Sequence, residues 1–167
     1  MLGYPGAGKT TTAKLISRAT GAILLSSDQI RLEMFKAPEF TPQEHNELYK
    51  ALDKRTEELL MAGKSVIYDA NLNRHTHRQE KYEIAKRAGA RPVLIWVDTP
   101  KAVAKERAKH FSRQHLWPRN ETPENMFDRI ANVIEPPRDN EPIVKINGEL
   151  ITQHEINLLL EHITKTA

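Results

Sequence analysis

The chain alternates short apolar runs with longer segments in which apolar residues recur every three or four positions. Short apolar runs are typical of buried strands, and they occur at 22–25, 65–68, 92–97 and 143–146. The longer periodic segments predict helices, which we expect at 9–19, 41–61, 76–88, 99–110, 122–134 and 153–163. Strands and helices that alternate in this way build a parallel sheet between helices, so we predict an α/β three-layer sandwich.

The length of 167 residues fits one domain, 1–167, with a single core. Thr99 is placed to cap the helix that follows it. Residues 111–121 have no clear period and connect two predicted helices. We therefore expect a flap or lid at about 107–121.

A glycine-rich segment opens the chain, and Gly3 to Thr10 reads Gly-Tyr-Pro-Gly-Ala-Gly-Lys-Thr. In this pattern backbone N–H groups surround nucleotide phosphates, the lysine reaches the β and γ oxygens, and the hydroxyl joins the Mg²⁺ shell. The pattern predicts a P-loop fold of the nucleoside triphosphate hydrolase class, with ATP and Mg²⁺ as cofactors. The predicted ATP-binding residues are Gly3, Pro5, Gly6, Ala7, Gly8, Lys9, Thr10 and Thr11.

A phosphate-binding loop of this kind ordinarily follows a buried strand, but only Met1 and Leu2 precede Gly3. We therefore expect the first strand of the sheet to be truncated in this sequence. We expect about five further apolar residues upstream, the usual length of a strand.

Asp28 and Arg31 are the candidates for the acceptor side of a phosphoryl transfer. Ser26-Ser27-Asp28 provides N-cap chemistry for a helix through about Phe35, and Asp28 lies at the carboxyl end of a predicted strand. A carboxylate there can accept the proton of an attacking hydroxyl, and a guanidinium one turn later can hold an acceptor phosphate. The alternatives are a plain helix cap for Asp28 and a solvated helix position for Arg31.

Asp69 ends another predicted strand and is the candidate acidic group for the Mg²⁺ shell, together with Thr10. Its alternative role is that of a turn aspartate. Three arginines in or near the flap, Arg107, Arg113 and Arg119, are candidates to neutralise charge on the transferring phosphoryl group. A solvated surface charge is the alternative for each of them.

Charge and composition narrow the chemistry further. The chain has no cysteine, which excludes disulfides, thiolate zinc sites and a cysteine nucleophile. The net charge is +3, but residues 71–119 carry +8 and the remainder −5, so an anionic ligand would be drawn to that window. No apolar run is long enough for a membrane span and no leader is visible, which predicts a soluble cytoplasmic protein. No obligate protein partner can be inferred.

The motifs together resemble the P-loop kinases related to polynucleotide 5′-hydroxyl kinase and, more loosely, the zeta toxins and chloramphenicol phosphotransferase. The resemblance runs from Gly3 to about Ile134. Its anchors are the glycine-rich loop, Asp28-Gln-Ile-Arg31, and Val66-Ile-Tyr-Asp69-Ala-Asn71-Leu-Asn73 followed by Arg78. It implies that Asp28 is the general base, that Arg31 contacts an acceptor phosphate, and that Asp69 supports the active site. It leaves open whether Arg107 or Arg113 is the lid arginine.

The leading prediction is an ATP-dependent kinase in which Lys9, Asp28, Arg31 and a flap arginine act on an acceptor hydroxyl. A polynucleotide or nucleotide-like 5′-hydroxyl is the preferred acceptor, because Arg31 and the basic window at 71–119 both favour an anion. The alternatives are a small-molecule kinase of the same fold, a non-catalytic ATP-binding module and a hydrolytic switch.

Overall fold

The computed structural model describes residues 1–110, 118 and 120–165. Arg113, Arg119 and most of the predicted flap lie outside these residues, and 107–109 are helical. The strands are β1 (Ile23–Ser26), β2 (Val66–Asp69), β3 (Leu94–Asp98) and β4 (Ile143–Asn147). The helices are α1 (Lys9–Thr20), α2 (Ser27–Met34), α3 (Pro42–Met61), α4 (His75–Arg87), α5 (Lys101–Lys109), α6 (Pro123–Ala131) and α7 (Gln153–Lys165).

The four strands form two parallel pairs, β1 with β2 and β3 with β4. Leu2 lies between the pairs: its N–H donates to Ile95 O at 2.9 Å, and its carbonyl accepts from Val97 N–H at 2.9 Å. On the other side, the amino group of Met1 donates to Tyr68 O of β2 at 3.2 Å. The first two residues thus occupy the centre of the sheet. The predicted parallel α/β fold is confirmed, while the upstream strand stays a prediction.

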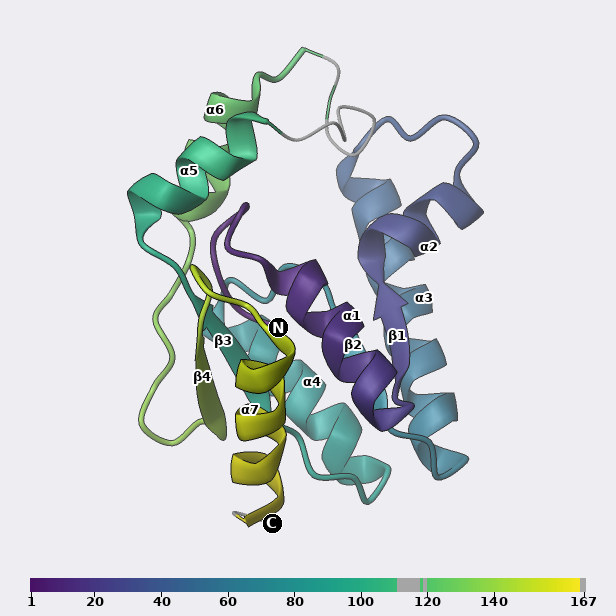
Figure 1. Cartoon of the computed structure of the whole chain (residues 1–167). Coiled ribbons are helices and arrows are strands. Elements are labelled where there is room, and N and C mark those ends of the chain that lie inside the picture. The colour runs from purple at the N-terminus through teal and green to yellow at the C-terminus, as the bar shows by residue number, and fades with distance from the viewer. Residues whose placement is uncertain (111–117, 119, 166–167) are drawn as a thin grey trace.

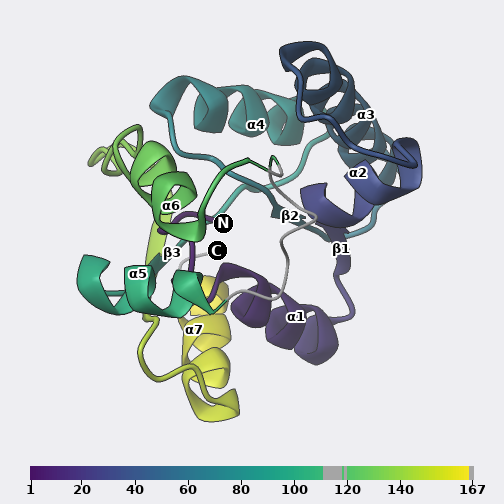
Figure 2. The ribbon, with the colours of Figure 1, turned by 90° about the horizontal axis from the view of Figure 1, so that it is seen from above.

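Helices cover both faces of the strands (Figure 2). α1 and α7 contact each other on one face, and α3 and α4 contact each other on the other. α2, α5 and α6 stand at the end of the sheet where the strands finish, around the loop that precedes α1 (Figure 1). Three helices therefore surround the glycine-rich loop at this end of the sheet (Figure 1).

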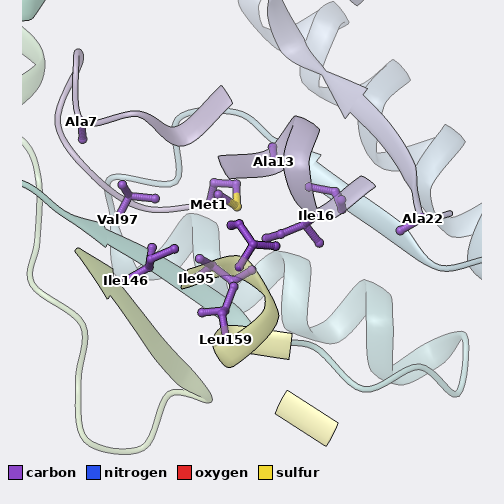
Figure 3. Packing of buried hydrophobic residues seen from close by; sticks show 11 residues of the cluster. Met1, Ala7, Ala13, Ile16, Ala22, Ile95, Val97, Ile146 and Leu159 are labelled. Atoms are coloured by element: carbon purple, nitrogen blue, oxygen red, sulfur yellow. The ribbon is translucent and has the colours of Figure 1, made fainter. Parts of the chain in front are cut away.

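The larger hydrophobic cluster lies between the strands and the α1–α7 layer (Figure 3). Met1, Ile16 and Leu159 meet Ile95 and Val97 of β3 there. A second cluster around Leu25, Leu48, Leu52 and Ala70 fixes α2 and α3 to the other face. Each fully buried aliphatic side chain stabilises the fold by about 1.5–3 kcal/mol, so the two clusters hold the loops above them in place.

The predicted helix ends are mostly confirmed, with one correction. Thr41 is the N-cap of α3 and accepts from Glu44 N–H at 3.2 Å, and Gly21 ends α1 in the left-handed region at φ 72°. The expectation that Thr99 caps α5 is wrong, because the N-cap is Pro100. The Thr99 hydroxyl instead donates to Ala7 O at 2.9 Å, so it braces the glycine-rich loop.

Arg78 of α4 is wholly buried and holds the loop after β2. Its Nη1 donates to Leu72 O at 3.1 Å and Asn73 O at 3.2 Å. Its Nε and Nη2 donate to the Glu141 carboxylate at 2.6 and 2.9 Å, and Tyr82 donates to the same carboxylate at 2.9 Å. Arg78 thereby ties the loop that follows Asp69 to the segment before β4.

Candidate functional site

The glycine-rich loop runs directly into the amino end of α1. The first N–H groups of a helix have no acceptor within the helix, and the first bond of α1 here is Thr12 N–H to Gly8 O at 2.9 Å. The helix end therefore presents unpaired N–H donors and a partial positive charge to an anion. Lys9 Nζ donates to Gly3 O at 2.9 Å and Tyr4 O at 3.0 Å, which folds the lysine over the loop.

Glycine is required in this loop by packing as well as by backbone conformation. Gly6 has φ 82°, and a Cβ there would lie 2.2 Å from Ala104 O of α5. Gly8 has φ 102°, and a Cβ there would lie 2.4 Å from Ile151 Cδ1. A left-handed conformation costs any other residue free energy, so both positions are closed to side chains.

The turn after β4 packs against the glycine-rich loop. Gly148 N–H donates to Asp98 O at 2.9 Å, and a Cβ on Gly148 would lie 1.9 Å from Thr99 Oγ1. Arg107 Nη1 of α5 donates to Gly148 O at 2.7 Å. Arg107 is thus held at this turn. A role for it on the transferring phosphoryl group stays a prediction.

A cavity of about 830 Å³ opens at the carboxyl end of the strands. It brings together the predicted site residues Lys9, Thr10, Asp28, Arg31 and Asp69. Of the other predicted residues, Pro5, Gly6, Gly8, Thr11 and Arg107 also line it. Gly3 and Ala7 are buried beneath the loop. The volume is within the range of about 300–1,000 Å³ that is usual for small-molecule sites.

The two acidic candidates come from neighbouring strands. Asp69 is the last residue of β2 and pairs in register with Ser26, the last residue of β1. Ser26 is the N-cap of α2, so Asp28 stands within the first turn and is not the cap residue. Parallel strands finish at the same edge, which is why both carboxylates reach the cavity that Lys9 enters.

The environment of Lys9 changes its acidity. Burial lowers the pKa of Lys9 from 10.5 to about 8, although the carboxylates of Asp69 and Asp28 oppose that change. A bound triphosphate adds negative charge beside the ammonium, so it should raise the pKa again. We therefore expect nucleotide binding to depend on pH through Lys9.

We predict that ATP binding takes up a proton between pH 8 and pH 10.5, where the free protein has lost the Lys9 proton and the complex retains it. The affinity should then fall above pH 8 by up to about tenfold per pH unit. Calorimetric titration at pH 8.5 in two buffers of different ionisation enthalpy measures this uptake. Lys14→Gln, an exposed position on α1, should behave like the wild type. Equal heats in both buffers would contradict the prediction.

The residues at the cavity also fit a magnesium ion by their chemistry. Thr10 offers a hydroxyl, Asp28 and Asp69 offer carboxylates, and all three line the cavity. Mg²⁺ prefers hard oxygen ligands and retains several waters, so it needs few protein groups. When bound, the ion would neutralise charge on the nucleotide phosphates.

The wall of the cavity around Arg31 contains residues that the sequence did not single out. Phe40, His45 and Tyr49 line it, and the rings of His45 and Tyr49 lie 4.5 Å apart between centroids. Burial and the positive charges of Arg31 and His77 lower the pKa of His45. His45 and Tyr49 are four residues apart on one helix face. This spacing was the available signal, but the apolar stripe of the same helix obscured it.

Together, the glycine-rich loop, the amino end of α1 and the carboxylates define a P-loop domain. The chain belongs to the AAA domain family, which matches residues 1–137. The comparison with curated proteins gave no match. The polynucleotide kinase resemblance therefore stays a prediction within this broader family.

Solved structures with the same fold include several kinases. A sugar kinase from Janibacter sp. HTCC2649 has a TM-score of 0.71 at 18% identity, over 98% of this chain and 91% of that one. A gluconokinase from Sinorhizobium meliloti 1021 has a TM-score of 0.67 at 17% identity, over 99% of this chain and 91% of that one. The Mycobacterium tuberculosis APS kinase in complex with AMPPNP and APS has a TM-score of 0.69 at 17% identity, over 98% of this chain and 94% of that one. At these identities the likeness confirms the P-loop, kinase-like fold.

None of the helices in the described part of the chain is both long and apolar enough to cross a bilayer. The cytoplasmic location stays a prediction.

Proposed function

We propose that this protein is a kinase that transfers the γ-phosphoryl group of ATP to a hydroxyl of a small anionic molecule. The observation that carries the proposal is the shared cavity. Lys9 and Thr10 of the phosphate loop face it from one side, and Asp28 and Arg31 of α2 face it from another. A protein that only bound ATP would need no carboxylate and guanidinium on the acceptor side.

The proposed reaction follows from these positions. The Asp28 carboxylate accepts the proton of the acceptor hydroxyl, and the acceptor oxygen forms a bond to the γ-phosphorus. The bond from the γ-phosphorus to the β–γ bridging oxygen breaks, and ADP leaves with the electron pair. The Lys9 ammonium and the helix N–H groups stabilise the charge on the phosphate oxygens. Arg31 holds an anionic group of the acceptor by charge-assisted hydrogen bonds.

The basic window at 71–119 bears on the nature of the acceptor, because its charge in the sequence favours a polynucleotide. Several cations of this window pair with carboxylates from outside it, which offsets much of the +8 charge. These pairs are Arg78 with Glu141, Lys81 with Asp53, Arg87 with Glu57, and Lys105 with Asp128. The cavity volume of about 830 Å³ and the small molecules named for the sugar kinase, gluconokinase and APS kinase support a small acceptor instead.

The proposal is tested by an acceptor screen with γ-labelled ATP and Mg²⁺. The panel contains sugars, hydroxy acids and phosphorylated or sulfated alcohols, and 5′-hydroxyl oligonucleotides are assayed beside them. We expect label in one of the small anionic acceptors. Label in the oligonucleotides alone would favour the polynucleotide kinase. ATP binding with no labelled product across the panel would favour a binding module.

A further inference from the structure

The turn that leads into α3 contains a strained residue. Phe40 has φ 59°, and it is the non-glycine residue with positive φ in the described part of the chain. An aromatic side chain rarely adopts this left-handed conformation, so the surroundings must stabilise it. Residues in such conformations gather at ligand sites. Phe40 itself lines the cavity.

Glu44 holds the strained turn. Its Oε2 accepts from Phe40 N–H at 2.7 Å, and both carboxylate oxygens accept from Glu39 N–H at 3.0 Å. Its own N–H donates to Thr41 Oγ1 at 3.2 Å. In an ordinary capping box the carboxylate reaches the N–H of the cap residue. Here it reaches the two residues before the cap, so it fixes the backbone conformation of Phe40.

The turn is fixed against Arg31. The guanidinium carbon lies 4.9 Å from the centre of the Phe40 ring, and Nη1 lies 3.6 Å from Glu44 Oε2. Arg31 is 8% exposed, and its Nη1 has no hydrogen-bond partner among the described residues. The distance to Glu44 is too long for a hydrogen bond. A buried guanidinium with an unused donor, at the wall of a cavity, is suited to receive an anion from that cavity.

We propose that Phe40 and Glu44 are positioning residues that hold Arg31 ready for an anionic group, a phosphate, sulfate or carboxylate, on the acceptor. This inference rests on the proposed function, because it places the acceptor beside Arg31. The ring covers one face of the guanidinium and the carboxylate beside it sets its orientation, so Arg31 stays in place at the cavity wall with a hydrogen-bond donor unused. The strain at Phe40 is explained by this task, since a glycine would satisfy the turn but leave Arg31 uncovered.

The test measures anion binding directly, so that it does not depend on transfer. Inorganic sulfate is titrated into the full chain, and the Nε–H resonance of Arg31, assigned by its loss in Arg31→Lys, reports binding. The titration is run with and without AMPPNP, which fills the phosphate loop. Phe40→Gly removes the ring and relieves the backbone, and Glu44→Asp keeps the charge but shortens the side chain that reaches the N–H groups of Glu39 and Phe40. Glu47→Asp, at an exposed glutamate of the same helix, is the control.

We expect sulfate affinity to fall about five- to thirty-fold in Phe40→Gly and Glu44→Asp. The control should bind as the wild type does, and the melting temperature of Phe40→Gly should not fall. A merely structural turn would predict unchanged affinity in the glycine variant. The inference is overturned if both variants titrate like the wild type, or if sulfate leaves the Arg31 resonance unmoved. Failure of AMPPNP to bind would count against the proposed function and leave the sulfate result readable.

Discussion

Replacing Asp28 with asparagine should lower the turnover number of the kinase by about 10²–10⁴-fold, the usual contribution of a general base. Asparagine has nearly the same shape but cannot accept the hydroxyl proton. Asp28 lines the cavity with Lys9 and Thr10 from a different element, α2. The change leaves every residue of the phosphate loop in place and removes only one of the two carboxylates near Lys9, so most of the ATP affinity should be retained.

The measurement pairs steady-state kinetics on the best acceptor with calorimetric titration of ATP. Glu33→Gln, an exposed carboxylate of the same helix, is the matched control and should keep full turnover. Turnover within a factor of about three of the wild type in Asp28→Asn would remove Asp28 from the mechanism. Loss of ATP binding in parallel would mean that Asp28 supports the nucleotide rather than the acceptor.

Removing Glu141 should destabilise the fold by about 3–5 kcal/mol, because it leaves the Arg78 guanidinium buried without its counter-charge. Both side chains are wholly buried in this ion pair. Glu141→Leu should lower the melting temperature by about 2–4 °C per kcal/mol in a chain of this size. The double variant Arg78→Met/Glu141→Leu should recover part of the loss, since no charge is then stranded. A single variant as stable as the wild type would contradict this account.

The Arg78–Glu141 ion pair should also make the free energy of unfolding depend on pH in the acid range. Burial alone would disfavour the charge, but hydrogen bonds from Arg78, the Arg138 N–H and Tyr82 outweigh it and lower the pKa of Glu141 from 4.5 to about 2. A carboxylate whose pKa is lower in the folded state than in the unfolded state stabilises the fold at pH values above its unfolded-state pKa. That stability, about 3 kcal/mol, should be present above pH 4.5 and lost as the pH falls toward 2. Urea unfolding from pH 6 to pH 2.5 measures it, and Glu141→Leu should lack this part of the slope.

The local patterns were sufficient to predict most of the fold. Apolar runs located β1 to β4 to within one or two residues, and the periodic segments located the starts of α3 and α6 to within one residue. The glycine-rich loop and Asp28 could be assigned to one cavity because parallel strands finish at one edge. These features depend on neighbours in sequence, or on a topological rule, and so a sequence reveals them.

Other features depend on contacts between distant segments. Thr99 and Ala7 are 92 residues apart, and their hydrogen bond replaces the helix cap that local reasoning assigned to Thr99. Arg78 and Glu141 are 63 residues apart. The charged residues near each of them in the sequence do not indicate that these two are buried as a pair. The left-handed Phe40 has none of the usual turn residues at its position. Sequence periodicity carries no information on such pairings.

The central claim is that the γ-phosphoryl group passes to an acceptor hydroxyl and not to water. Phosphorus-31 NMR of a reaction with ATP, Mg²⁺ and the best acceptor measures this most directly. The account predicts a new phosphomonoester signal that grows in equal amount with ADP, and no ADP when the acceptor is left out. Inorganic phosphate as the product, formed at the same rate with or without acceptor, would contradict it.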